Sequence, residues 1–442
     1  MSKDNTKVLE EYAPVYSNPL DYHSGSIASH TPPPTSTYKT DNLNKLNEYT
    51  RPGKYAIHAT KPLITQDDLG LAYSPGVALP CYEIHRDVNE TYKYTSRGNT
   101  VAVVSNGTAI LGLGNLGAAA SSPVMEGKAV LFKKFANIDS VPIVIDENDP
   151  DKLIDIITSL RFNFGGINLE DIKAPECFYI EKKLKERLDI PVFHDDQHGT
   201  AVVVLAGLIN ALKLANKSIR DIKVVINGAG AAGIACASLL IHMGLNRYNL
   251  ILCDSSGVIH EGRLNEINEW KKEYATKDRI LTLKDAVIDS DVFIGLSVKN
   301  ALSPNMLRSM SKNPIVFAMA NPDPEITPYD AKKTREDVII ATGRSDYPNQ
   351  INNVIGFPYI FRGALDAKAS VINMQMCEAA IHAIANITTL DVPQNIKDIY
   401  NNQSLKYGRD YIIPTPFDKR LFETVPKAVT KAALDSKAVL KL

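Results

Sequence analysis

The feature that most constrains the fold is a glycine turn between an apolar run at residues 223–226 and a helical pattern at 234–243. The turn has the spacing G-x-G-x-x-G, carried by Gly228, Gly230 and Gly233. A second strand-like run follows the helix. This order is a βαβ unit, whose two strands lie parallel because the helix crosses over the sheet. The sequence therefore predicts a Rossmann-type α/β domain around a doubly wound parallel sheet.

The remaining elements are predicted from apolar periodicity. The parallel sheet is expected to contain strands at residues 223–226, 249–253, 292–294, 315–318 and 338–341. Nearer the N-terminus, apolar runs at 101–104 and 108–111 flank Asn106-Gly107, which favours a hairpin turn. A buried strand is expected at 141–145, an amphipathic helix at 151–160, and mainly helices from residue 357 onward.

These patterns predict four successive parts. Residues 1–45 are rich in Ser, Thr, Tyr, Asn and Pro and read as a flexible or extended arm. An N-terminal α/β domain is expected at 46–195, and the Rossmann domain at 196–345. The helices of 346–442 are expected to pack back on the first domain.

Composition excludes several classes of protein. The net charge is −1, from 49 basic and 50 acidic residues, and no basic stripe predicts a nucleic-acid partner. Five widely spaced cysteines do not predict a disulfide framework, and indicate thiols in a reducing compartment. The longest apolar run, around 201–212, is too short to predict a membrane span, and no targeting segment is evident. A cytoplasmic protein is expected.

The glycine turn at 228–233 has the context of a dinucleotide site. It follows a strand and opens a helix, so its backbone N–H groups would face a pyrophosphate. Asp254 ends the next strand, 21 residues after Gly233 (254 − 233), where a ribose-binding carboxylate is expected. The predicted cofactor-binding residues of this turn are Gly228, Ala229, Gly230, Ala231, Ala232, Gly233 and Asp254.

A second G-x-G-x-x-G occurs at Gly112, Gly114 and Gly117. It follows the expected hairpin, and its candidate acid Asp146 is 29 residues further on (146 − 117). The context favours a tight turn that lets the backbone approach a substrate or a neighbouring strand, rather than a second dinucleotide site.

Two acidic pairs are candidates for a metal site. Glu170-Asp171 follow an apolar run, and Asp195-Asp196 come 25 residues later. Convergent carboxylates suit Mg²⁺ or Mn²⁺. His194 and His198 stand four residues apart, so a zinc site is an alternative, and two solvated acidic turns are another.

Together these pieces resemble the malic enzymes, specifically their small-subunit bacterial class, from about residue 51 to the C-terminus. The likeness is carried by six motifs in the family's order: Leu71-Ala72-Tyr73-Ser74-Pro75-Gly76-Val77, Pro123-Val124-Met125-Glu126-Gly127-Lys128, Gly165-Gly166-Ile167-Asn168-Leu169-Glu170-Asp171, Phe193-His194-Asp195-Asp196-Gln197-His198-Gly199-Thr200, Ala320-Asn321-Pro322 and Asn352-Asn353. The resemblance implies oxidative decarboxylation of L-malate to pyruvate and CO₂, with NAD or NADP and with Mg²⁺ or Mn²⁺, by a homodimer.

The resemblance also implies roles for individual residues. Lys128 would be the general base for the C2 hydroxyl, and Tyr73 the acid that protonates C3. A bound cation nearby and partial desolvation would lower the pKa of Lys128, as a base requires. Glu170, Asp171 and Asp196 would be the metal ligands, with Asp195 in support. Asn321 and Asn353 would contact the substrate, and Asn321 also the nicotinamide end of the cofactor.

Several alternatives remain open in the sequence. Larger malic enzymes carry an arginine for a substrate carboxylate where this chain has Ala109, so the group that holds the remote carboxylate is not assigned. Asp254 favours NAD, whereas Ser255, Ser256 and Arg263 could contact the 2′-phosphate of NADP. A non-redox oxaloacetate decarboxylase and a catalytically silent dinucleotide-binding protein are the alternative functions.

Overall fold

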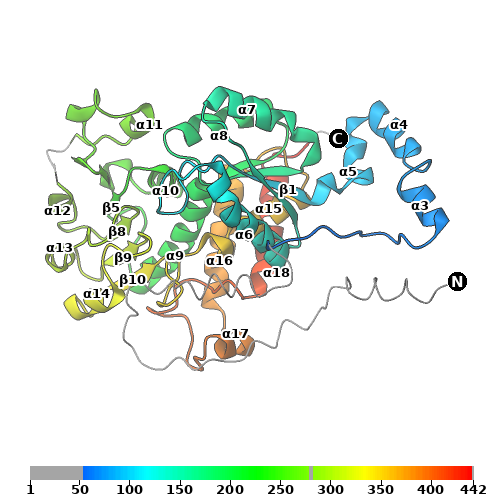
Figure 1. Cartoon of the computed structure of the whole chain (residues 1–442). Helices are drawn as coiled ribbons and strands as arrows, with labels where there is room; N and C mark the ends of the chain where they lie inside the picture. Colours follow the sequence, from blue (N-terminus) through cyan, green and yellow to red (C-terminus); the bar gives the residue numbers. More distant parts are fainter. Residues whose placement is uncertain (1–52, 278–281, 441–442) are drawn as a thin grey trace. The chain divides into compact units, whose positions relative to one another are not determined.

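The computed structural model describes residues 53–277 and 282–440 of the 442-residue chain. The arm predicted at residues 1–45 lies outside the described residues. Figure 1 shows two parallel sheets with helices around them, as the βαβ pattern predicts. The mixed α/β class with a Rossmann-type sheet is therefore confirmed.

The first sheet has the strand order β2-β1-β3-β4, and every neighbouring pair is parallel. Its strands are β1 Thr100–Ser105, β2 Asp139–Val144, β3 Gly166–Leu169 and β4 Val192–His194. The helices that connect them are α6 Ala118–Ala136, α7 Pro150–Ser159 and α8 Glu176–Arg187. The predicted helix at 151–160 is α7, which starts where Asp149 accepts hydrogen bonds from two backbone N–H groups and Pro150 occupies the first turn.

The hairpin predicted around Asn106-Gly107 is wrong. Strand β1 pairs only in parallel, and residues 108–111 form no strand. A Cβ on Gly107 would lie 2.2 Å from the carbonyl oxygen of Gly117, so the chain loops out and returns to begin α6 beside the end of β1. The first glycine motif therefore also stands in a βαβ unit, and its context does not separate it from the second.

The strand predicted as buried at 141–145 is β2, which lies at the edge of the sheet with partly exposed residues. An edge strand has a neighbour on one side only. Apolar side chains of β2 pack on α6, and the free edge of the strand stays open to solvent.

The second sheet has the order β10-β9-β8-β5-β6-β7 and is parallel except for the short β7. All five predicted strands are confirmed to within about one residue. Their bounds are β5 Val224–Asn227, β6 Leu250–Asp254, β8 Val292–Gly295, β9 Ile315–Ala318 and β10 Ile339–Thr342, with β7 at Gly257–Val258. The surrounding helices are α9 Thr200–Ala215, α10 Ala231–His242, α11 Glu269–Lys272, α12 Leu283–Ala286, α13 Pro304–Ser309 and α14 Pro328–Thr334.

Helix α9 continues a π-helical turn, η4 Asp195–Gly199. The 21-residue helical run from Asp195 to Ala215 is long and apolar enough to cross a membrane by composition, so the apolar run is longer than its 201–212 core predicts. Its residues are mostly buried inside the protein, which is typical of a core helix.

The C-terminal part is helical as predicted, with α15 Phe357–Asp366, α16 Met374–Thr389, α17 Gln394–Ile399 and α18 Arg420–Asp435. Helix α15 packs against α6 and α18, and α16 packs against α9 and α18. One apolar core therefore runs through both sheets and these helices.

The first described helices are different. They are α3 Gln66–Ala72, α4 Ala78–Arg86 and α5 Thr91–Tyr94, and α3 and α4 contain no buried residue. Helix α3 is defined locally, because Thr65 and Asp68 form a reciprocal capping box at its start.

Candidate active site

An acidic cluster forms where strands β3 and β4 end. Glu170 and Asp171 follow β3, and Asp195 and Asp196 follow the neighbouring β4. Carboxyl ends of parallel strands meet at one edge of a sheet, so the 25 residues between the pairs are closed by one crossover through α8. One carboxylate oxygen from each of Glu170, Asp171 and Asp196 lies within 4.8 Å of the other two. The structure thus brings the three predicted ligands together.

The cluster has the negative charge that suits a hard cation, and one of its carboxylate oxygens has no hydrogen-bond partner among the described residues. Glu170 and Asp171 are buried, and the Asp196 side chain is 35% exposed. Burial and mutual repulsion raise the pKa of all three carboxyls. The Asp171 N–H donates to Asp196 Oδ2 at 2.8 Å, yet Asp171 Oδ2 has no partner among the described residues. An oxygen ligand set of this kind fits Mg²⁺ or Mn²⁺.

Lys128 extends from α6 to this cluster. Its side chain is 7% exposed, and its Nζ lies 2.9 Å from Glu170 Oε1 and within ion-pair distance of Asp195. Its ammonium also lies 4.1 Å from the centre of the Phe357 ring. Burial lowers the pKa of Lys128, but Asp195 and Glu170 raise it more, so the net pKa is raised. The protein's own charges therefore do not lower the pKa of Lys128, as a general base would require.

Asp195 is the second carboxylate that contacts Lys128, and it accepts a hydrogen bond from Lys128 Nζ. The Asn353 amide donates to the same Asp195 oxygen that accepts from Lys128, so the structure places Asn353 beside the predicted base. A Cβ on Gly199 would overlap Asp195 Oδ1 at 1.7 Å, which makes a glycine necessary where the carboxylate folds over η4. Asp195 thus links Lys128, Asn353 and the π-helical turn.

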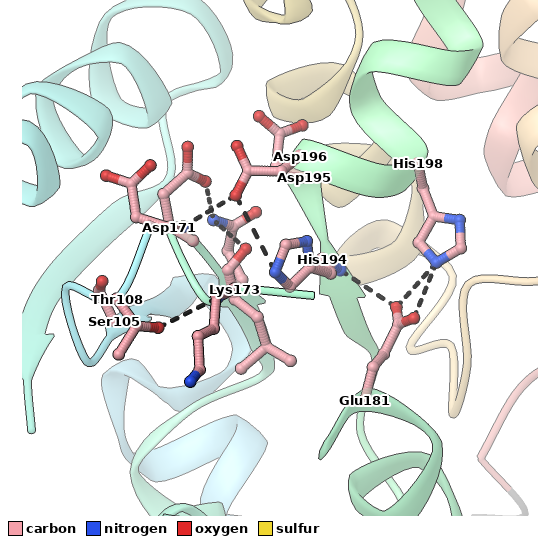
Figure 2. A network of polar contacts seen from close by, with 12 residues as sticks. Ser105, Thr108, Asp171, Lys173, Glu181, His194, Asp195, Asp196 and His198 are labelled. Carbon is pink, nitrogen blue, oxygen red and sulfur yellow. Dashed lines mark hydrogen bonds and ion pairs between the residues drawn. The ribbon is translucent and has the colours of Figure 1, made fainter. Parts of the chain in front are cut away.

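A second buried carboxylate supports that turn, as Figure 2 shows. Glu181 on α8 accepts a hydrogen bond from the His194 N–H at 3.1 Å and pairs with His198 Nε2 at 2.9 Å. Lys185 lies 2.8 Å from the same carboxylate. His198 therefore faces Glu181 and is not part of the acidic cluster, which disfavours the zinc alternative. Burial lowers the pKa of the His194 imidazole to about 4.

The first glycine motif frames the cluster. The N–H groups of Ala109 and Leu111 donate to the backbone oxygen and to Oδ1 of Asp171. A Cβ on Gly112 would lie 2.9 Å from the carbonyl oxygen of Asn321, so this loop meets the loop after β9. Asn321 is exposed there, beside Gly343. The backbone here approaches the loop after β9 rather than a neighbouring strand, and its approach to a substrate stays a prediction.

Tyr73 is not brought to this cluster by the chain's own fold. It ends α3, and its side chain is 72% exposed. The segment before α3 is tied to α6, where Lys54 donates to Glu126 and to the carbonyl oxygen of Pro123. The predicted acid and the predicted base therefore occupy opposite environments, one in solvent and one buried.

The second glycine motif has the expected dinucleotide geometry. Gly228 has φ +124°, and a Cβ on it would lie 2.3 Å from the carbonyl oxygen of Leu296. A Cβ on Gly233 would lie 1.8 Å from the carbonyl oxygen of Gly228, so both positions require glycine. Gly230 caps α10 with no side-chain hydrogen bond, which leaves the N–H groups of Ala231 and Ala232 available to a phosphate.

Asp254 is not free to act alone. Its carboxylate lies 3.0 Å from Arg263 Nη2 and 2.9 Å from Lys271 Nζ, and it accepts a hydrogen bond from the Ser256 N–H. Burial alone would raise the pKa of Asp254. These contacts lower it by more than burial raises it, so the net pKa is below its ordinary value. Arg263 Nε also lies 3.9 Å from the exposed Glu266 carboxylate, so two cations and two carboxylates meet here and their formal charges cancel (2 − 2).

Comparison with known proteins places this site in a family. Residues 52–185 match the malic enzyme N-terminal domain, and residues 197–402 match the malic enzyme NAD binding domain. The NADP-dependent malic enzyme of Halomonas elongata is 54% identical over 385 residues, which is 87% of this chain and 91% of that one. The chain belongs to the malic enzyme family.

Two further malic enzymes define the extent of the likeness. The probable NADP-dependent malic enzyme of Rickettsia prowazekii is 58% identical over 90% of this chain, but this chain spans only 53% of that protein's length. The crystal structure of the malic enzyme from Pyrococcus horikoshii Ot3 has a TM-score of 0.82 at 42% identity, covering 90% of this chain and 91% of that one.

Three charged residues whose contacts shape the two strand-end regions were not predicted from the sequence: Glu181, Lys271 and Glu325. Glu181 and Glu325 contact residues that are distant in the chain, and Lys271 lies on the short helix α11, which has no motif. The only sequence signal is weak, since Glu325 follows the Asn321-Pro322 motif by a few residues.

Proposed function

We propose that this chain catalyses the oxidative decarboxylation of L-malate to pyruvate and CO₂ with reduction of a nicotinamide dinucleotide. The observation that carries the proposal is the meeting of Lys128 with the acidic cluster of Glu170, Asp171 and Asp196. A base beside convergent oxygen ligands, at the end of a sheet that adjoins a dinucleotide turn, suits a 2-hydroxy acid.

The chemistry assigns a task to each protein group. Lys128 takes the proton of the C2 hydroxyl as hydride leaves C2, and Asp195 and Asn353 hold its amine in place. Glu170, Asp171 and Asp196 would hold Mg²⁺ or Mn²⁺, which would supply a Lewis acid for the C2 oxygen and would offset the charge of Glu170, one of the two carboxylates that raise the pKa of Lys128. Tyr73 then protonates C3 after CO₂ has left.

We propose NADP as the dinucleotide. Asp254 alone would repel a 2′-phosphate, but the cations Arg263 and Lys271 pair with it and offset its charge. An arginine near this position is the usual partner of the 2′-phosphate. The proposal is also consistent with the names of the Halomonas and Rickettsia relatives, both of which are called NADP-dependent.

We propose that the active form is a cytoplasmic homodimer in which Tyr73 enters the partner's site. The helices α3 and α4 expose a set of large apolar side chains, which are Leu69, Leu71, Tyr73, Val77, Leu79 and Tyr82. Exposed apolar surface of this kind is typical of an interface. A second copy would cover it and supply the acid that one chain leaves in solvent.

Mixing two inactive variants tests the homodimer. Tyr73→Phe and Lys128→Ala should each lose malate oxidation, and a mixture re-equilibrated between subunits should regain activity, because one of its two sites is then intact. A mixture as inactive as its components, in a sample shown to exchange subunits by size and mass, would place Tyr73 in its own chain's site.

The proposed reaction is tested by absorbance of reduced nicotinamide with L-malate, Mn²⁺ and either dinucleotide. We expect malate-dependent reduction that requires the metal and is faster in kcat/KM with NADP than with NAD. Release of CO₂ from oxaloacetate without any reduction from malate would favour the decarboxylase alternative. Dinucleotide binding without either reaction would favour the silent binding protein.

A further inference from the structure

Glu325 is a fully buried carboxylate in the second sheet, outside the acidic cluster. Its exposed fraction is 0%. Its Oε1 accepts a hydrogen bond from the Ser297 N–H, and its Oε2 accepts one from the Ala320 N–H, each at 3.0 Å. A buried carboxylate is costly unless such bonds compensate it, so the two loops and this side chain require one another.

The two loops lie at the crevice where a Rossmann-type sheet binds its ligand. Ser297 follows β8 and Ala320 follows β9, and both strands end at the same edge of the sheet. The chain continues from β5 to β6 on one side, whereas β8 lies on the other side of β5. This reversal of strand order is the topological switch point, outside which dinucleotides bind.

Each loop also touches a glycine motif. On one side, Ser297 Oγ accepts from the Asn227 amide at 2.6 Å, and Leu296 lies directly against Gly228. On the other side, Ala320 precedes Asn321, whose carbonyl oxygen contacts Gly112. Glu325 thus bridges the loop that backs the dinucleotide turn and the loop that meets the substrate side.

The space for this carboxylate is made by a glycine. A Cβ on Gly295 would lie 2.4 Å from Glu325 Cδ. The carboxylate therefore occupies the end of β8, where any side chain larger than hydrogen would displace it.

We propose that Glu325 is a positioning residue for hydride transfer, which holds the two loops at the separation that sets the nicotinamide against C2 of the substrate. The inference rests on the proposed function. Glu325 touches neither the substrate nor the metal ligands, and it acts through Ser297 and Ala320.

The substitution Glu325→Gln isolates this role. Glutamine has nearly the same shape but presents one acceptor and one NH₂ group, so one of the two backbone N–H groups faces a donor. The tie between the loops is then broken on one side while the volume is retained. Glu336→Gln is the matched control, because Glu336 is an exposed glutamate of the same sheet domain.

The experiment compares three quantities in the full chain. They are the dissociation constant of reduced dinucleotide, kcat for malate oxidation and the rate of Mn²⁺-dependent oxaloacetate decarboxylation. Binding is followed by fluorescence of Trp270, the single tryptophan, which adjoins Lys271. We expect Glu325→Gln to weaken dinucleotide binding and lower kcat by about tenfold each, with oxaloacetate decarboxylation unchanged and Glu336→Gln like wild type.

Equal loss of all three quantities would overturn the inference, because it would indicate a general structural role. A lower melting temperature with unchanged binding and kcat would overturn it as well. If Glu325→Gln does not fold, Ser297→Ala, which removes the links of the Ser297 hydroxyl to Asn227 and Glu325 at an exposed site, should shift binding and kcat in the same direction by less. Failure of wild type to oxidise malate would reject the proposed function instead, while dinucleotide binding would still test Glu325.

Discussion

The two sheets end in acidic groups that differ in how their charge is balanced. After β3 and β4, Glu170, Asp171 and Asp196 share one ammonium, Lys128, which pairs with Glu170 and Asp195. After β6, the single Asp254 is paired with two cations, Arg263 and Lys271. The first region has more carboxylates than cations and suits a divalent cation, whereas in the second two cations offset the strand-end carboxylate, which is compatible with a phosphate. A carboxylate at a strand end therefore does not identify its ligand until its partners are known.

The comparison predicts that removing a cation has different consequences in the two regions. In the acidic cluster, Lys128→Ala should lower kcat for malate oxidation by about 10²–10⁴-fold, because a positioned general base contributes that much. Binding of malate, metal and dinucleotide should persist. Steady-state kinetics and dinucleotide titration measure both. A variant that keeps more than about a tenth of wild-type kcat would remove Lys128 from its role as base.

Removing an acid from the cluster should weaken the metal site. Asp196→Asn takes away one charge at nearly constant shape, and the Mn²⁺ concentration for half-activity should rise about tenfold or more. Stabilisation of the fold by Mn²⁺ should fall in parallel, measured as the shift in melting temperature. Asp189→Asn is the control, since Asp189 is exposed just before β4. The same Mn²⁺ response in both variants would contradict the ligand assignment.

The smallest effect is expected in the second region. Lys271→Ala should raise KM for NADP about tenfold, the usual value of a hydrogen bond to a charged group, with kcat and KM for NAD unchanged. Lys272→Ala alters the exposed neighbour on the same short helix and serves as control. An equal rise in KM for NAD and NADP in Lys271→Ala would contradict a role of this region in recognising the 2′-phosphate.

Glu181 and Glu325 extend the comparison to the groups behind each site. Both are buried carboxylates that hold backbone N–H groups of loops at strand ends. Glu181 is balanced by His198 and Lys185, whereas Glu325 is balanced by backbone N–H groups and the Ser297 side chain, without a cation among the described residues. The loop structure of both regions thus depends on charged groups that do not contact a ligand.

Much of the fold follows from local sequence. The apolar periods of residues 223–253 and the glycine spacing specify β5, α10 and β6, because hydrophobic period and turn chemistry act within about ten residues. The motif with Glu170 and Asp171 and the motif with Asp196 likewise marked the three acids that converge. The first prediction needed only the order of residues along the chain. The residues alone left the two acidic pairs open to a zinc site or to solvated turns, and the choice of the three ligands came from the resemblance to the malic enzymes.

Tertiary structure decided the rest. The Asn106-Gly107 hairpin failed because Gly107 packs on Gly117, ten residues away, and the chain turns into α6. The ionisation of Lys128 depends on Asp195, 67 residues further along, and the character of Asp254 on Lys271, 17 residues away. Electrostatic free energy depends on distance and burial in space, which a linear pattern does not contain. The sequence by itself thus determined the strand–turn–helix unit and named the candidate site residues, and only the folded chain decided which of them meet and the charge each one presents.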